Sequence, residues 1–186
     1  MPADWIELLK IAFIGLGGGF ALYRYAGDQK WKRQQFATAL YRTFAEKDTT
    51  RKAMTMLDWT RYVELHPEAA PESRFVKVDR EALIAALSTT RQKYSRDEVR
   101  IRDIFDAFLA DLAEFEHHIA TRLLAAKQVE PYLAYWAKLI TGNGHRKDPE
   151  LWTAVERYIE FYDYAAVKSL FSRFGYAVWK GRSVAT

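Results

Sequence analysis

The feature that most constrains the fold is a run of thirteen uncharged residues, IAFIGLGGGFALY (11–23). At 1.5 Å per helical residue this run is about 20 Å long, which is short of the ~30 Å hydrocarbon core of a bilayer. Extended to residues 5–25, the segment reaches about 31 Å and can cross. A buried core helix or an interfacial helix are the alternatives, but an interfacial helix needs a polar face that 11–23 lacks. We therefore predict a transmembrane anchor over residues 1–27.

The charges on the two sides of this segment predict its orientation. Asp4 and Glu7 precede the run, whereas basic residues follow it. The positive-inside rule then places the N-terminus outside a bacterial inner membrane and the remaining chain in the cytoplasm. Because the start lacks a basic region, we expect an anchor that is not cleaved. The basic residues expected to contact lipid headgroups or other phosphates are Arg24, Lys30, Lys32 and Arg33.

Small residues crowd the middle of the predicted span and indicate helix–helix association. Glycine is unfavourable in soluble helices, but in lipid a face of small residues lets two helices approach closely. Glu7 and Lys10 lie three residues apart on one helix face, so several assembled copies would give a polar mouth there. The predicted association face consists of Ala12, Gly15, Gly17, Gly19 and Ala21.

The rest of the chain predicts an all-α fold, with a cytosolic bundle of about six helices over residues 28–176 and a basic tail over 177–186. The spacing of apolar residues predicts helices over 29–47, from 48 or 49 to 65, from 80 onwards and over 95–126. Three more are predicted: one with Pro131 in its first turn, one opening at Pro149 and one stopping at Gly175. Gly27 and Asp28 either break the anchor from the next helix or lie within one long rod. The segment FVKV (75–78) is too isolated to predict a sheet.

Most chemistry that a site could carry has no complete motif in this sequence. The chain has no cysteine, which excludes disulfides and thiolate metal sites. Glu114 and His117 have the E-x-x-H spacing of di-iron proteins, but no second copy exists, so we expect solvated surface there, including Glu116 and His118. The pair Gly142 and Gly144 predicts a helix end and turn. We predict no metal and no cofactor.

Two basic patterns suggest an interaction with nucleic acid. Arg61 and His66 fit the Arg-x4-6-His spacing of HEPN ribonucleases, in which such a pair acts on RNA, although about one match is expected by chance in this composition. A histidine at a helix end, near unsatisfied carbonyls, is the alternative. A basic cluster enters the helix predicted over 95–126 and would hold RNA or a nucleotide messenger, unless acidic neighbours pair with it at i,i+4. That cluster consists of Arg91, Lys93, Arg96, Arg100 and Arg102.

The order of these segments resembles a known group of proteins. An N-terminal span followed by residues 31–58 and 101–136 is similar to bacterial single-pass proteins with a helical cytosolic domain, and to the accessory membrane protein of type VI-B CRISPR loci. That resemblance implies a HEPN-like helical domain on one membrane helix and an oligomeric, pore-forming effector of antiphage defence. Tyr62 departs from the HEPN pattern, which has a polar residue after the arginine.

Three functions therefore remain open on the sequence. The leading hypothesis is a non-enzymatic, membrane-anchored helical protein that forms a homo-oligomer or joins a membrane complex. The second is a membrane-tethered HEPN-like ribonuclease that uses Arg61 and His66. The third is a structural subunit of a larger membrane assembly.

Overall fold

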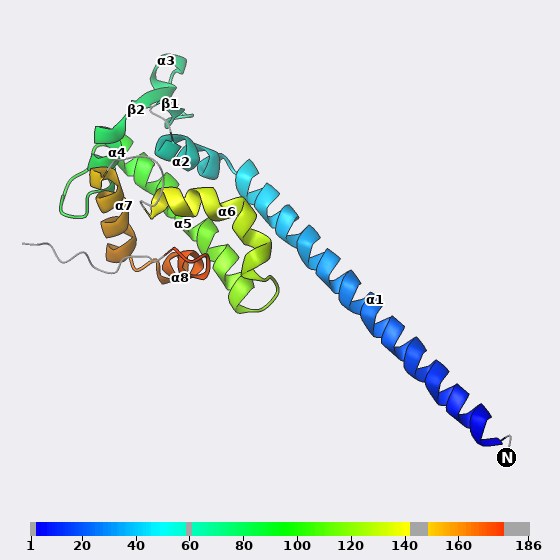
Figure 1. Cartoon of the computed structure of the whole chain (residues 1–186). Helices are drawn as coiled ribbons and strands as arrows, with labels where there is room; N and C mark the ends of the chain where they lie inside the picture. The colour runs from blue at the N-terminus through cyan, green and yellow to red at the C-terminus, as the bar shows by residue number, and fades with distance from the viewer. Residues whose placement is uncertain (1–2, 59–60, 142–148, 177–186) are drawn as a thin grey trace, which may run out of the picture. The chain divides into compact units, whose positions relative to one another are not determined.

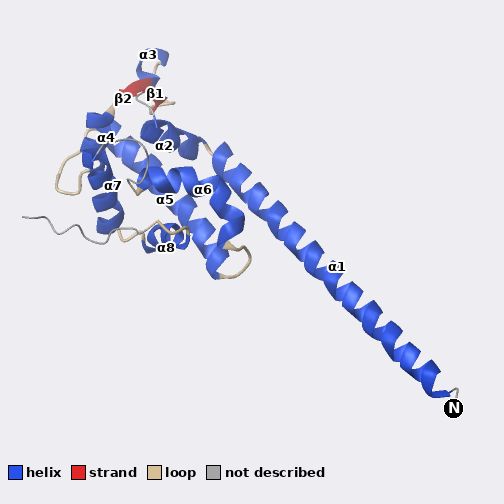
Figure 2. Ribbon diagram, in the orientation of Figure 1, coloured by secondary structure: helices blue, strands red, loops and turns tan. Residues whose placement is uncertain are grey.

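The computed structural model describes residues 3–58, 61–141 and 149–176, except for the side chains of residues 3–9, 11–15, 17, 21 and 26. Within these ranges the chain forms eight helices and one two-stranded sheet (Figures 1 and 2). It divides into two compact units, residues 1–39 and 40–186. The all-α prediction is confirmed in part, since the described residues are mostly helical but include one small sheet. The elements are α1 (Ala3–Glu46), α2 (Asp48–Asp58), β1 (Arg61–Glu64), α3 (Pro71–Arg74), β2 (Phe75–Val78), α4 (Arg80–Leu87), α5 (Arg96–Ala120), α6 (Ala126–Ile140), α7 (Pro149–Phe161) and α8 (Ala165–Arg173).

Helix α1 is one uninterrupted helix from Ala3 to Glu46. Of the two possibilities at Gly27 and Asp28, the long rod is therefore correct. The helix continues through the predicted domain boundary at 27/28 and through the unit boundary at 39/40.

The core of the second unit is organised around α5, which packs against α2, α4 and α8 (Figure 1). Apolar residues recur along α5 at steps of three and four, so they form one face of the helix, and that face is buried. Removal of this stripe from water is the main stabilising contribution of the helix. The buried apolar residues of α5 are Ile101, Ile104, Phe105, Phe108, Leu109, Leu112, Phe115 and Ile119.

Residues 40–46 of α1 belong to the second unit and pack there through aromatic rings. The ring of Phe44 lies 5.9 Å from that of Phe108 and 5.2 Å from that of Phe115, perpendicular to the latter. The ring of Tyr41 stacks on that of Tyr132 in α6 at 4.9 Å. Offset and edge-on pairs of this kind add about 0.5–1.5 kcal/mol each beyond the burial of their area.

A β-hairpin corrects the sequence prediction for residues 58–78. The helix predicted to reach Leu65 ends at Asp58, and β1 pairs with β2 in antiparallel register, with Val63 opposite Val76. The segment 75–78 is therefore a strand, contrary to the prediction. Strand β2 alternates more and less exposed positions, and one residue of each strand, Val63 and Val78, is buried, so the ribbon is partly covered.

The end of α5 and the start of α6 also differ from the prediction. Helix α5 stops at Ala120 because Arg122 takes a left-handed conformation (φ 62°) and the amide of Leu124 donates to the carbonyl of His118. The helix predicted over 95–126 therefore ends earlier than expected, and beyond its end Leu123 is exposed and Leu124 is buried. Helix α6 starts at Ala126, so Pro131 lies in its interior and not in its first turn.

Other predicted helix ends are confirmed. The side chain of Asp79 accepts a hydrogen bond from the amide of Ala82 and caps α4. Ser95 caps α5 in a reciprocal arrangement with Glu98. Gly175 follows α8 with φ 77°, a conformation that favours glycine. The turn predicted at Gly142 and Gly144 and the tail predicted over 177–186 lie outside the described residues.

Candidate functional site

Exposed apolar side chains on α1 are the first candidate functional surface. Leu16 and Tyr23 are 72% and 77% exposed, and Phe20, Leu22 and Tyr25 are exposed as well. With 100° of rotation per residue, Leu16, Phe20 and Tyr23 lie on one side of the helix, and Leu22 and Tyr25 lie on the opposite side. A helix with large apolar side chains on two opposite sides is typical of a membrane span or of a protein core, because a helix that rests on one core needs only a single apolar stripe.

The described residues include no helix that is both long and apolar enough to cross a membrane. The predicted span covers residues 5–25, and most of its side chains lie outside the described residues. The anchor therefore stays a prediction.

No close contact among the described residues explains why glycine stands at positions 18, 19 and 27 of α1. A Cβ atom placed on Gly18, Gly19 or Gly27 would meet nothing within 4 Å. Each glycine inside a helix costs about 1 kcal/mol relative to alanine. The side-chain environments of residues 12, 15, 17 and 21 of the predicted association face, and of Glu7 at the predicted polar mouth, are not described, whereas Lys10 is exposed.

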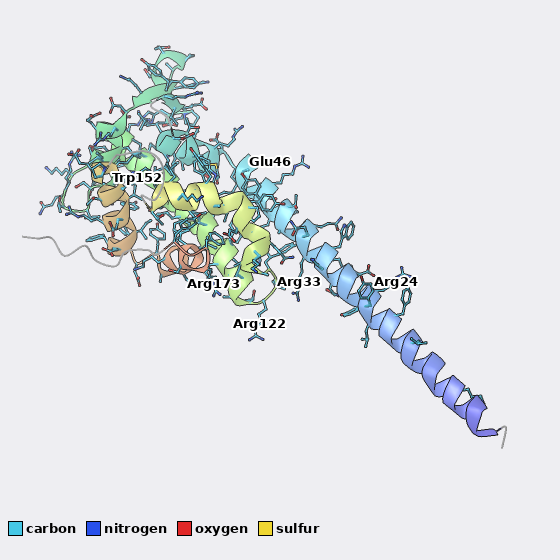
Figure 3. All side chains as sticks on the ribbon, viewed as in Figure 1. Arg24, Arg33, Glu46, Arg122, Trp152 and Arg173 are labelled. Carbon is cyan, nitrogen blue, oxygen red and sulfur yellow. The ribbon has the colours of Figure 1, made fainter. Side chains whose placement is uncertain are left out.

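The basic residues that follow the predicted span are exposed and can bind phosphate groups. Within the described part of the chain, Arg24, Lys30, Lys32 and Arg33 are all exposed, and no hydrogen bond or ion pair engages them. Figure 3 labels Arg24 and Arg33 on α1. A group of unpaired cations can bind phosphate groups without first breaking an ion pair.

Arg61 and His66 occupy very different environments. Arg61 lies exposed on β1, whereas His66 follows the strand and is only 4% exposed. The Nε2 atom of His66 lies 2.6 Å from Oδ1 of Asp97 on α5, and its amide donates to the carbonyl of Arg74. The alternative position at a helix end is wrong, because the residue follows a strand. The geometry gives His66 a structural role joining the hairpin to α5 and adds no support for the ribonuclease hypothesis.

Glu68 joins this cluster from the hairpin loop. Its carboxylate lies 2.7 Å from Arg96, 3.3 Å from Arg100 and 3.6 Å from Nδ1 of His66. A hydrogen bond from its own backbone and then the guanidinium groups of Arg100 and Arg96 lower the pKa of Glu68 to about 2. The carboxylate therefore stays charged well into acid solution and keeps its two arginine partners.

Ion pairs also engage three of the five residues of the basic cluster at the start of α5. Arg96 and Arg100 pair with Glu68, and Arg91 pairs with Glu98. Pairing is thus found as expected, but the partners are not the neighbours one helical turn away. The engaged arginines are less available to phosphate groups, which weakens the prediction of nucleic acid binding there.

The E-x-x-H segment contains a buried ion pair that the sequence analysis did not foresee. Glu116 is 6% exposed, and both of its oxygens accept hydrogen bonds from Nε of Arg173 on α8 at 2.8–2.9 Å. Ser169 donates a third at 2.8 Å. The expectation of a solvated Glu116 is therefore wrong. Among the described residues, no group of three His, Asp or Glu side chains is arranged to hold a metal ion.

An aromatic cage around Arg102 is the other cluster that sequence reasoning missed. Its guanidinium carbon lies 4.2, 4.9 and 5.4 Å from the ring centres of Tyr94, Tyr158 and Tyr162. The same group donates to the carbonyls of Ala86 at 2.7 Å and Ser88 at 3.1 Å, and thereby caps the end of α4. The cage stabilises the junction of α4, α5 and α7.

Asp106 lies one turn further along α5 and receives two phenol groups. The hydroxyls of Tyr158 and Tyr164 each donate to its Oδ1 at 2.7 Å. Burial, and then the hydrogen bond to Asp106, raise the pKa of both phenols above the usual value. Both tyrosines therefore remain protonated donors, and nothing in this arrangement prepares them as a base.

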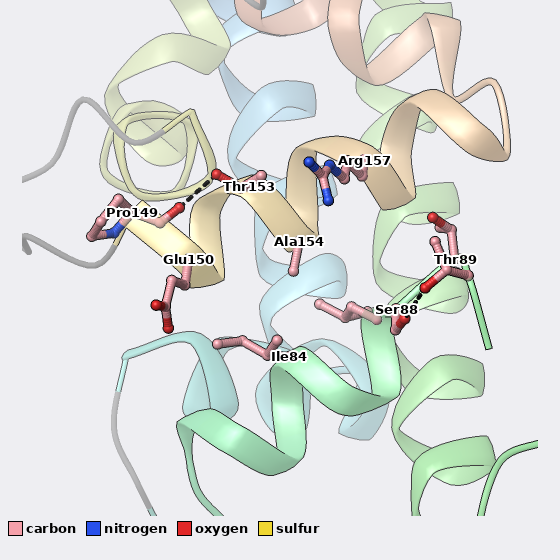
Figure 4. Close-up of a pocket in the computed structure, with 10 residues that line it drawn as sticks. Ile84, Ser88, Thr89, Pro149, Glu150, Thr153, Ala154 and Arg157 are labelled. Atoms are coloured by element: carbon pink, nitrogen blue, oxygen red, sulfur yellow. Dashed lines mark hydrogen bonds between the residues drawn. The ribbon is translucent and has the colours of Figure 1, made fainter. Parts of the chain in front are cut away.

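A groove of about 350 Å³ lies between α4 and α7 (Figure 4). Ile84 of α4 and Ser88, which follows α4, line it on one side, and Thr153, Ala154 and Arg157 line it from α7, with Ala154 pointing toward Ile84. A smaller hollow of about 240 Å³ lies beside Arg61, Asp58 and Trp136. The first groove is the larger of the two and has an apolar floor.

Comparison of the chain with protein-family models, with characterised proteins and with solved structures finds no match to any of them.

Proposed function

We propose that this protein is a membrane-anchored helical module that self-associates through the small residues of its N-terminal helix, with residues 40–186 on the cytoplasmic side. The observation that carries the proposal is the exposure of large apolar side chains on two opposite sides of α1 between Leu16 and Tyr25. Moving one such side chain out of water is worth about 1.5–3 kcal/mol. Leu16, Phe20 and Leu22 together would gain on the order of 5 kcal/mol in lipid.

The flanking charges support the orientation. Arg24, Lys30, Lys32 and Arg33 follow the apolar segment and have no partner among the described residues. Each cation close to an anionic leaflet contributes about 1 kcal/mol. Tyr23 and Tyr25 lie next to them and suit the interface between headgroups and acyl chains.

The glycines support the self-association. Gly18 and Gly19 lower helix stability, and a Cβ atom at either position would meet nothing within 4 Å among the described residues. Close approach of a second helix gives these positions a use, because backbones can then pack through van der Waals contact. The segment is expected to associate with copies of itself or with another membrane helix.

Cysteine labelling tests the membrane part of the proposal. The chain has no cysteine, so a single substitution gives an unambiguous signal. We expect Ala3→Cys to react with a membrane-impermeant maleimide in intact cells, and Ser172→Cys to react only after the cells are opened. A protein that stays in the supernatant after lysis without detergent, or an Ala3→Cys variant that is reachable only from the cytosol, overturns the anchor.

Native mass spectrometry in detergent tests the self-association. We expect an oligomer for the unmodified chain and a shift toward monomer for Gly15→Leu and Gly19→Leu, since leucine holds the helices apart. Gly27→Leu is the matched control, because it lies outside the association face and also has open space around it. A monomeric unmodified chain would overturn the self-association, and an oligomer unaffected by both leucines would overturn the role of the small residues in it. Neither result bears on the anchor, which labelling tests separately.

A further inference from the structure

The groove between α4 and α7 has one unbalanced charge. Glu150 at one end pairs with Arg80 at 3.2 Å, so its charge is compensated. Arg157 also lines the groove, and no hydrogen bond or ion pair engages its guanidinium in the part of the chain that the structure describes. An anion can therefore accept hydrogen bonds from the guanidinium of Arg157 without first displacing a carboxylate of the protein.

The remaining lining combines an apolar floor with hydroxyl groups. Ile84 from α4 and Ala154 from α7 are half-buried and face each other across the groove (Figure 4). Ser88 and Thr90 stand at one rim, with their hydroxyl oxygens 3.2 Å apart. Thr153 already donates to the carbonyl of Pro149 and is not a free donor. The volume of about 350 Å³ lies at the lower end of the range for small-molecule sites.

We propose that this groove binds a small amphiphilic anion, with its carboxylate or phosphate on Arg157 and its compact apolar body over Ile84 and Ala154. The guanidinium fork gives the site its preference for charge, and the floor gives it a preference for an apolar body over a bare ion. The proposal does not depend on the membrane anchor, because the groove lies entirely within residues 40–186.

Binding of three soluble probes to the full chain in detergent tests the proposal. The probes are 4-phenylbutyrate, phenyl phosphate and the neutral 4-phenylbutan-1-ol, measured by calorimetry and by saturation-transfer NMR against a detergent blank. For ligands of this size we expect a Kd in the millimolar range for the anions. The alcohol should bind at least about tenfold more weakly, since it lacks the charge-assisted hydrogen bonds. Whichever of 4-phenylbutyrate and phenyl phosphate binds with the lower Kd identifies the head group that the site prefers.

Two variants and a control place the probe in the groove. Arg157→Gln should weaken binding of the anions about tenfold or more and leave the alcohol unchanged. Because Arg157 is exposed, this variant should fold normally, and its thermal unfolding checks that. Ala154→Phe should block all three probes by filling the floor. Lys127→Gln removes one exposed cation outside the groove and should change nothing.

Three results would overturn the assignment. They are equal binding of the alcohol and the anions, unchanged anion binding in Arg157→Gln, and anion binding weaker than about 10 mM in the unmodified chain.

Discussion

Replacing Arg102 with alanine should cause a large loss of stability in the second unit. The side chain donates hydrogen bonds to the carbonyls of Ala86 and Ser88 and to the hydroxyl of Tyr162, and it lies against three tyrosine rings. Truncation removes all of these contacts at once. It also takes from the carbonyl of Ala86 its side-chain donor, whereas the carbonyl of Ser88 keeps the hydroxyl of Tyr94.

The magnitude follows from these contacts. Hydrogen bonds to a charged group contribute about 1.5–3 kcal/mol each when measured by mutation, and a cation over an aromatic ring contributes about 0.5–2 kcal/mol. The contacts share one side chain and do not add fully, so we expect a loss of about 3 kcal/mol in the free energy of unfolding. For a unit of this size that corresponds to a fall of about 6–12 °C in Tm.

Urea unfolding of the full chain, followed by the near-ultraviolet circular dichroism of the tyrosines, measures this loss. Arg102→Lys keeps the charge but loses the planar fork, so it should recover only part of the stability. Arg96→Ala is the control, because that arginine pairs with Glu68 on the surface and should cost no more than about 0.5 kcal/mol. The reasoning is refuted if Arg102→Ala is no more destabilising than this control.

Two further predictions concern the other charged clusters. Arg173→Ala should lower the free energy of unfolding by about 3 kcal/mol, because it leaves the buried carboxylate of Glu116 without its cation. Glu116→Ala should lower it by only about 1–2 kcal/mol, because Arg173 is partly exposed to water. Equal losses in urea unfolding would contradict this reasoning. The pKa of Glu68 is lowered from 4.5 to about 2, so its contribution to stability is complete above pH 4.5 and is lost as the pH falls toward 2. Carboxyl NMR should show that midpoint, and Arg100→Gln should raise it only in part, since the largest cause is the backbone hydrogen bond; an unchanged midpoint would exclude the arginine's contribution.

The sequence predicted those parts of the fold that depend on neighbours along the chain. The apolar stripe of α5 is long and regular, and the starts of α4 after Asp79 and of α5 after Ser95 depend on contacts within three residues, so these features can be predicted from neighbouring residues. The stop at Arg122 was missed because a left-handed conformation at a residue other than glycine leaves no mark in the sequence.

Pairings between distant segments could not be predicted in this way. The strand at Val63 needs a partner from 75–78, and a four-residue run alone does not distinguish a strand from the end of a helix. The cage around Arg102 combines three helices and a loop, and nothing in the spacing of one helix distinguishes this arginine from Arg96 or Arg100. The groove at Arg157 depends on the same long-range packing, so it became visible only in the folded chain.

The hairpin has a consequence for the behaviour of the protein at high concentration. A sheet of two strands leaves the outer edge of each strand without a backbone partner within the described residues, and such edges recruit strands from other molecules. Here both edges are only four residues long, and charged Lys77 lies directly across from exposed Tyr62. Short strands and charged lysines protect sheet edges from pairing between molecules. Neutralising Lys77 should therefore favour aggregation at high concentration even if the free energy of unfolding does not change.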